Sequence, residues 1–143
     1  MCPSSGVIGS ADEFVELRTS DNEAEHHQAV HDELPEAVCL EIIERFPDMR
    51  KWVAQNKTVP LAILRVLAVD PDERVRRMVA MKRKLDRELF ELFSRDPDEI
   101  IRAGLTTNRK LPLDILQQLA TDESSFVRAA AVRRLDAREA TER

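Results

Sequence analysis

The sequence predicts an all-α protein: a right-handed α-solenoid of about four short two-helix units, preceded by a polar capping helix. The heptapeptide at 70–76, Asp-Pro-Asp-Glu-Arg-Val-Arg, returns in altered form at 96–102 and at 122–128, 26 residues later each time. The apolar residues around it keep the same step and fall at helical spacing. A period of roughly 20–50 residues indicates supersecondary units that stack on one another.

Each unit is expected to hold two helices. The first begins at a proline or an aspartate, as at Pro60, because the first N–H of a helix has no intrahelical partner for proline to remove. Asp70 is placed to end the first helix and to cap the second. Helices of about ten residues are not stable alone in water. Stacking of neighbouring units is therefore needed to bury their apolar stripes.

The unit at 111–131 combines a Leu-Pro start, two further leucines, an aspartate and a Val-Arg pair. This pattern resembles the leucine-rich repeat variant and the HEAT-like α-solenoid repeats of bacterial proteins, over roughly residues 34–135. HEAT units are similar in pairing an aspartate with an arginine six residues on, as Asp122 and Arg128 do. The resemblance implies the architecture and leaves the ligand open. Two cysteines cannot supply the iron–sulfur module that accompanies some variant repeats, so no cofactor is expected.

Domain organisation follows from the same pattern. Residues 1–20, rich in Pro, Gly and Ser, are predicted to be a flexible segment, and residues 21–143 a single solenoid domain. Ser20 and Glu23 fit a capping box that opens a very polar helix, which suits the exposed end of a solenoid. The predicted elements are a capping helix at 21–33 and units at 34–56, 57–82, 83–108 and 109–135.

The net charge of −5 is unevenly distributed, because residues 1–36 hold nine acids and a single base. Membrane spanning is not expected, since no apolar run approaches the about 20 residues that a span needs. The first ten residues lack the basic and apolar regions of a signal peptide. Cys2 and Cys39 are too few for a disulfide framework. We therefore expect a cytoplasmic protein with free thiols.

Several chemically conspicuous residues have plain structural interpretations. The repeated Asp–Arg pairs recur in every full unit, which favours a scaffold role over a binding site. His27 and His31 share a helix face with Glu23 and could face a zinc ion, but nothing supplies a fixed fourth ligand. We expect these histidines to be solvated and expect Cys39 to be a buried small apolar residue.

Basic residues are densest between residues 74 and 87. Arg109 and Lys110 repeat Arg83 and Lys84 at the 26-residue step, so the loops between units are predicted to form a basic ridge. The ridge is either a solvated edge with salt bridges or a surface for phosphate or an acidic protein. Nucleic-acid binders of this type are usually more basic, and the chain has no tyrosine to stack on bases.

No phosphate loop, nucleophile elbow or paired carboxylates occur, so no enzymatic activity is expected. The sequence predicts a protein-binding solenoid, most specifically a bacterial immunity protein that neutralises a basic nuclease-type toxin. A nucleic-acid binder using the ridge and a scaffold or adaptor protein are the alternatives. The predicted partner-binding residues are Glu23, Glu25, Asp32, Glu33, Trp52, Arg77, Lys82, Arg83, Lys84, Arg87, Arg109 and Lys110.

Overall fold

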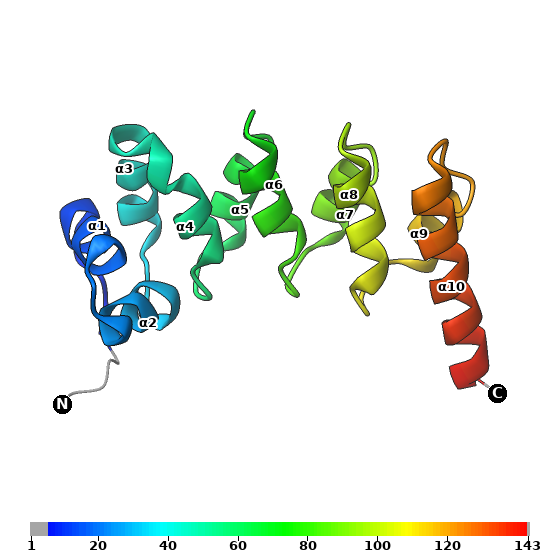
Figure 1. Ribbon diagram of the computed structural model, residues 1–143, viewed down its shortest axis with the longest axis horizontal. Helices are drawn as coiled ribbons and strands as arrows, with labels where there is room; N and C mark the ends of the chain where they lie inside the picture. Colours follow the sequence, from blue (N-terminus) through cyan, green and yellow to red (C-terminus); the bar gives the residue numbers. More distant parts are fainter. Residues whose placement is uncertain (1–5, 143) are drawn as a thin grey trace. The chain divides into compact units, whose positions relative to one another are not determined.

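A computed structural model describes residues 6–142, and every regular element in this range is a helix, apart from one isolated bridge between Val7 and Glu33 (Figure 1). The predicted all-α class is confirmed. The elements are α1 (Ala11–Thr19), α2 (Glu23–His31), α3 (Glu36–Arg45), the 3-10 helix η1 (Pro47–Met49), α4 (Arg50–Gln55), α5 (Leu61–Leu67), α6 (Glu73–Ala80), α7 (Arg87–Phe93), α8 (Glu99–Gly104), the 3-10 helix η2 (Leu105–Thr107), α9 (Leu113–Leu119) and α10 (Ser125–Glu142).

The chain divides into two compact units, an N-terminal unit that ends at Val79 and a C-terminal unit that begins at Ala80. Within the described residues of both units, no helix is both long and apolar enough to cross a membrane.

Helix bounds follow the 26-residue step of the sequence. Helices α5, α7 and α9 have seven residues each and begin at Leu61, Arg87 and Leu113. The preceding residue is Pro60, Asp86 or Pro112, and the backbone of Pro60 and Asp86 is extended. Proline fixes the backbone angle for helix entry, whereas the Asp86 side chain accepts a hydrogen bond from the Leu89 N–H at 3.0 Å. The two-helix units thus form locally as the sequence predicts, and their stacking as a solenoid stays a prediction.

The N-terminal unit has its core among α1, α3, α4 and α5. Phe14 of α1 and Ile42 of α3 have no exposed surface, and Ile8 and Leu34 are 1% exposed. This arrangement corrects the expectation of a flexible head over residues 1–20, of which residues 1–5 lie outside the described range. The physical reason is burial of two large apolar side chains, which offsets the entropy cost of ordering the segment.

Helix α2 begins differently from the predicted capping box. Its cap is Asn22, whose side-chain oxygen accepts from the Ala24 N–H at 2.8 Å. Ser20 instead ends α1, and its hydroxyl oxygen accepts from the Asn22 N–H at 3.2 Å. Asparagine and serine are equally good caps, so local sequence alone did not distinguish two candidates two residues apart.

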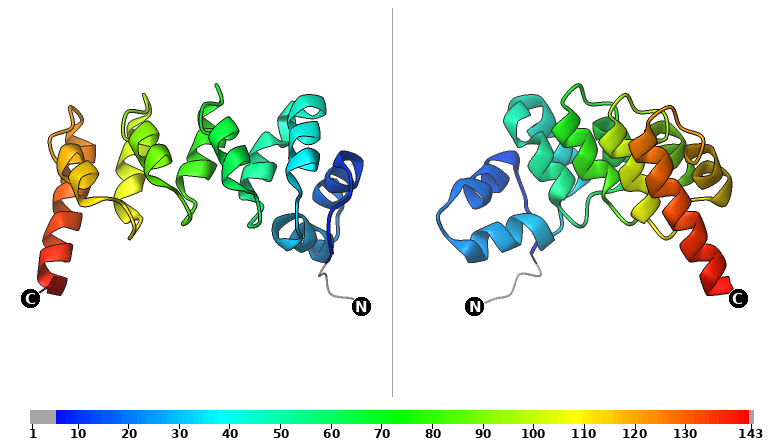
Figure 2. Two further views of the ribbon diagram at one scale, coloured as in Figure 1. Left: turned by 180° about the vertical axis from the view of Figure 1, so that it is seen from behind. Right: turned by 45° about the vertical axis from the view of Figure 1, so that its right-hand side comes forward.

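The core of the C-terminal unit lies between the helices of two pairs, α7 with α8 and α9 with α10. Phe93 and Leu116 have no exposed surface, and Ile101 and Val127 are at most 2% exposed. Helix α10 packs against both α8 and α9, and it continues beyond α9 to the end of the described chain (Figure 2). The predicted helical stripes are therefore buried as expected.

The Asp–Arg pairs connect successive helix pairs. In the C-terminal unit, Arg102 donates to the carbonyl oxygen of Asp96 at 2.6 Å and, through Nε and Nη2, to both carboxylate oxygens of Asp122 at 2.9 and 3.1 Å. In the N-terminal unit, Arg50 lies 2.7 Å from the carboxylate of Asp70. Bidentate arginine–carboxylate pairing fixes orientation as well as energy. These contacts support the scaffold interpretation of the Asp–Arg pattern.

Electrostatics at the Arg102–Asp122 pair favour the charged forms. Their side chains are 9% and 10% exposed. Burial raises the pKa of Asp122, but hydrogen bonds from Arg102 and from the Ser124 N–H lower it more, so the net pKa lies below the ordinary value. The hydrogen bond to Asp122 raises the pKa of Arg102. The pair is thus ionised at neutral pH, and its charges are compensated inside the unit.

Candidate functional site: a basic-loop groove

Two loops of the C-terminal unit, one after α6 and one after η2, enclose a groove of about 480 Å³. We call it the basic-loop groove. Arg83 on one side and Arg109 on the other lie one 26-residue step apart, and the two loops contribute a Lys-Arg pair and an Arg-Lys pair to the lining. The lining residues are Ala80, Met81, Lys82, Arg83, Thr107, Asn108, Arg109 and Lys110.

Asn108 holds the two loops together. Its Nδ2 donates to the carbonyl oxygen of Lys82 at 3.2 Å, and its Oδ1 accepts from the Lys110 N–H at 2.9 Å. One side chain thus fixes the second loop internally and joins it to the first. Because an amide carries both donors and an acceptor, asparagine performs both tasks where a purely basic residue would not.

The second loop is also held by α10. Arg138 Nη2 donates to the carbonyl oxygens of Leu111 at 2.9 Å and of Arg109 at 3.4 Å. Arg138 lies on the part of α10 that extends beyond the length of the other helices. The C-terminal part of α10 therefore has a structural role, because it supports the backbone at Arg109.

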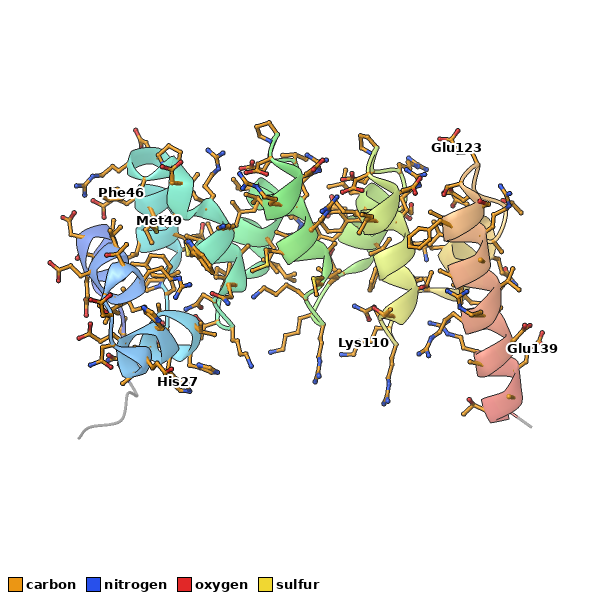
Figure 3. All side chains as sticks on the ribbon, viewed as in Figure 1. His27, Phe46, Met49, Lys110, Glu123 and Glu139 are labelled. Atoms are coloured by element: carbon orange, nitrogen blue, oxygen red, sulfur yellow. The ribbon has the colours of Figure 1, made fainter. Side chains whose placement is uncertain are left out.

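The charged side chains of the groove point to solvent. Arg83, Arg109 and Lys110 are exposed, and Lys82 is half-buried. In Figure 3 Lys110 lies at the loop edge of the unit, whereas Glu123 lies at the opposite edge, in the turn between α9 and α10. The acidic turn of Glu123 and the basic loop of Lys110 therefore occupy opposite edges of this unit.

Met81 is the exposed apolar residue of the groove. Its side chain is 78% exposed, the largest fraction among the exposed large apolar residues of the described chain. Methionine is flexible and polarizable, and it is common on adaptable binding surfaces. The groove can therefore bind carboxylate or phosphate groups through its cations and an apolar side chain through Met81.

Three other predicted basic residues lie outside the groove. Arg87 is exposed but makes ion pairs with Asp114 of α9 and with Glu91 on its own helix. Arg77 lies on α6, with its guanidinium 3.9 Å from Glu73. Lys84 is exposed in the first loop but does not line the groove. The structure therefore brings together Lys82, Arg83, Arg109 and Lys110 from the predicted ridge.

Trp52 lies half-buried in the N-terminal unit, between two cations. The guanidinium carbon of Arg18 is 3.7 Å from a ring centroid of the indole, and the Lys51 ammonium is 4.8 Å away. Cation–π contacts at such distances are attractive. Trp52 thus fixes α1 to α4. Arg18 was not predicted as a contact residue, although it is the single basic residue among the first 36.

The predicted acidic surface on and after α2 is smaller than expected. Glu23 and Glu33 are exposed and Glu25 is half-buried, but Asp32 is only 6% exposed. The Asp32 carboxylate lies beside Gly6, where an added Cβ would come within 3.2 Å of Oδ2. Asp32 is therefore part of the packing around the chain's first described residues, which corrects its assignment to the partner-binding surface.

The two histidines stack on each other. The rings of His27 and His31 are 3.9 Å apart and nearly parallel, and His31 Nδ1 lies 3.0 Å from the His27 carbonyl oxygen. Among residues 6–142, no group of three or more His, Cys, Asp or Glu side chains is arranged to hold a metal ion. Cys39 is buried, as predicted, and burial raises the pKa of its thiol to about 12.

Comparisons of the chain with protein-family models, with curated proteins and with solved structures find no match.

Proposed function

We propose that this chain is a non-enzymatic protein-binding module whose basic-loop groove captures an acidic segment of a protein partner. The observation that carries the proposal is the placement of two Arg/Lys pairs and the exposed Met81 around one groove of about 480 Å³. The cations would receive carboxylates, and Met81 would receive an adjacent apolar side chain. Methionine and arginine are both enriched at protein interfaces.

Two features favour a protein over nucleic acid as the partner. The groove has no aromatic side chain among its lining residues on which a base could stack. The chain also carries a net charge of −5, so its overall field opposes a polyanion that reaches beyond the groove. An acidic peptide segment is short enough to use the local positive charge alone.

The architecture proposed for the whole chain is the HEAT-like or variant leucine-rich repeat solenoid that its sequence resembles. The helix bounds that repeat at Leu61, Arg87 and Leu113 support it. In such an array each repeat presents equivalent loops on one edge. Equivalent loops are suited to an extended ligand, because successive loops can contact successive residues.

The proposal is tested by measuring binding of two labelled probes to the intact protein: a peptide of alternating glutamate and leucine, and a duplex DNA of random sequence. We expect the peptide to bind at least about tenfold more tightly at physiological salt, a difference of about 1.4 kcal/mol. Arg83→Glu should weaken peptide binding about tenfold. The matched control is Arg95→Glu, another exposed arginine of the same unit that does not line the groove.

Tighter binding of the DNA, with a steep loss of affinity as salt rises, would favour the nucleic-acid alternative. Equal effects of the two arginine substitutions would show that only net charge matters and that the groove is not the site.

A second candidate function is neutralisation of a basic nuclease-type toxin by the acidic helices α1 and α2. The supporting observation is a set of exposed carboxylates, which includes Asp12, Glu13 and Glu16 of α1 and Glu23 of α2. An acidic inhibitor surface is the electrostatic complement of a phosphate-binding cleft and speeds association. This candidate predicts that a neighbouring gene encodes a basic toxic domain that binds the chain.

Reversal of Glu23 and Glu25 to lysine should then slow association about tenfold and abolish protection of cells that express the toxic domain. Reversal of Glu123 and Glu139, two exposed acids of the C-terminal unit, is the matched control. If the neighbouring gene product neither binds the chain nor harms cells, this candidate is excluded.

A further inference from the structure

A second groove crosses the same C-terminal unit, between α8 and α10. Its volume is about 580 Å³, and the two helices that form it pack against each other (Figure 1). Small and apolar side chains form most of its lining. They include Ile100, Ala103, Gly104, Phe126, Ala130 and Ala137. We call it the α8–α10 groove.

The groove is open because its floor lacks large side chains. A Cβ added at Gly104 would meet no heavy atom within 4 Å, so the backbone of α8 is accessible at this point. Ile100 and Phe126 border the same space and are 51% and 53% exposed. Small residues that allow close approach, beside large exposed apolar ones, favour an apolar occupant with a regular backbone such as a helix.

The groove also carries positive charge. Arg133 and Arg134 of α10 line it, and the Nε–H of Arg134 is buried without a hydrogen-bond partner among the described residues. A buried donor without a partner costs free energy. Because that atom is enclosed by the protein, a carboxylate brought by an occupant would pair instead with the parts of the Arg133 and Arg134 guanidinium groups that line the groove, through a charge-assisted bond.

The α8–α10 groove and the basic-loop groove share one lining residue, Thr107. An occupant of the first groove that extends past Thr107 therefore comes close to the second. The chemistry differs between the two grooves, from a mostly apolar lining with two arginines to a mostly basic lining.

We propose that the α8–α10 groove docks an amphipathic helix of the protein partner, with apolar residues on Ile100 and Phe126 and a carboxylate on Arg134. The partner chain then continues past Thr107 and places an acidic stretch in the basic-loop groove. The second half of this proposal rests on the function proposed above, whereas the helix-docking half stands on the α8–α10 groove alone. Together the two grooves define one bipartite recognition element: a helix followed by an acidic tail.

The test is selection of binding peptides from a random display library on the intact protein. Enriched sequences should carry apolar residues three or four positions apart, as on one helix face, with carboxylates at and beyond the end of that pattern. Gly104→Leu should fill the groove and weaken these peptides at least about tenfold. Leu113→Ala, which removes an equally exposed apolar side chain outside both grooves, should leave binding unchanged.

Folding of Gly104→Leu is checked by thermal unfolding, and Ala130→Leu serves as a second filling variant from the opposite wall. Arg134→Gln should weaken the selected peptides, and Arg95→Gln, its control, should not. Sedimentation at rising concentration tests the other occupant, a second copy of this chain.

The outcomes separate the two proposals. If the selected peptides bind both filling variants as well as the unmodified protein, or if no peptide is enriched, or if the chain associates with itself through this groove, the helix-docking inference is overturned. If filling abolishes binding but Arg83→Glu has no effect, the helix site stands and the basic-loop proposal fails. The bipartite element is supported if the filling variants and Arg83→Glu all lose peptide binding while the control variants Leu113→Ala and Arg95→Glu keep it.

Discussion

Two asparagines at corresponding positions of the 26-residue step, Asn56 and Asn108, have opposite surroundings. Asn56 has no exposed surface and donates through Nδ2 to the carbonyl oxygens of Ala29 and Asp32, at 2.8 and 3.0 Å. Asn108 is half-buried and joins its own loop to that of Lys82. The first fixes a loop beneath helix α2, whereas the second holds open a groove between two exposed loops.

The loop of Asn56, which lies beneath α2 in the N-terminal unit, makes hydrogen bonds along its length. The Lys57 N–H donates to the Val30 carbonyl oxygen at 2.7 Å, and the Thr58 hydroxyl oxygen accepts from the Leu34 N–H at 2.9 Å. Loops of related sequence therefore have different roles in the two units. Where α2 packs on the loop of Asn56, the loop's hydrogen-bonding groups are used inside the protein. In the C-terminal unit, Arg138 of α10 holds the backbone of the loop, and the exposed side chains of Arg109 and Lys110 are available to a ligand.

The largest loss of stability is expected from substitutions in the apolar core. This loss should be similar in the two units. Leu67 and Leu119 occupy the same position of the step and are at most 2% exposed. Leu67→Ala and Leu119→Ala should each lower the free energy of unfolding by ~2–5 kcal/mol, as for other buried leucines. Urea unfolding followed by circular dichroism measures both. A loss below about 0.5 kcal/mol, the size expected of a surface change, would place either residue outside the core.

Substitution of the two asparagines should lower the stability of the two units by different amounts. Asn56→Ala is expected to cost about 2–4 kcal/mol, because each buried carbonyl left without a donor costs about 1–3 kcal/mol. Asn108→Ala should cost about 1 kcal/mol, since water can replace its bonds in a half-exposed loop. Fluorescence of Trp52, which lies in the N-terminal unit, follows the first change directly. Equal losses for the two variants would remove the distinction between covered and open loops.

Acid should weaken the C-terminal unit through Asp122. Its folded pKa lies below the ordinary value of 3.8, so its contribution is fully present above that value and is lost as pH falls through the folded pKa. Asp122→Asn should cost about 1–2 kcal/mol at neutral pH and reduce the loss of stability between about pH 5 and about pH 2. Glu139→Gln, an exposed carboxyl change on α10, is the control. An unchanged acid dependence in Asp122→Asn would contradict this assignment.

The smallest expected effect is a gain. Gly104→Ala should stabilise the protein by about 0.5–1 kcal/mol, because the residue is helical, the added Cβ meets open space, and alanine restricts the unfolded chain. A rise in the thermal midpoint without a change in peptide binding would show that a single methyl group leaves the α8–α10 groove usable. A destabilised variant would mean that the space beside Gly104 is smaller than described.

Sequence periodicity predicted the two-helix pairs because their boundaries depend on local signals, such as Pro60 and Asp86. It missed α1, whose stability comes from burial of Phe14 and from the contact of Arg18 with Trp52. Such contacts join residues far apart in sequence, and no repeat marks them. Asp32 was misassigned for the same reason: its neighbour Gly6 lies in a segment that was expected to be unstructured.

The candidate site was predicted in part. The step of 26 residues correctly indicated that Arg83–Lys84 and Arg109–Lys110 belong to equivalent loops. The sequence could not show that Arg87, unlike Arg83, is paired with Asp114, because that ion pair depends on the packing of α7 beside α9. The role of Asn108 had a visible signal, since Asn-Lys-Thr-Val-Pro at 56–60 and Asn-Arg-Lys-Leu-Pro at 108–112 are related segments.

The two hydrogen bonds from Arg138 to backbone carbonyl groups of the second basic loop should protect that loop from proteolysis. Trypsin-like proteases cut after lysine or arginine in chain that can unfold locally, and both exposed loops offer such bonds. The loop of Arg109 has its carbonyl groups tied to α10, whereas the loop of Arg83 and Lys84 has no such tie to α10 among the described residues. Nicking should therefore begin at the first loop, and removal of α10 beyond Asp136 should bring the second loop to the same rate.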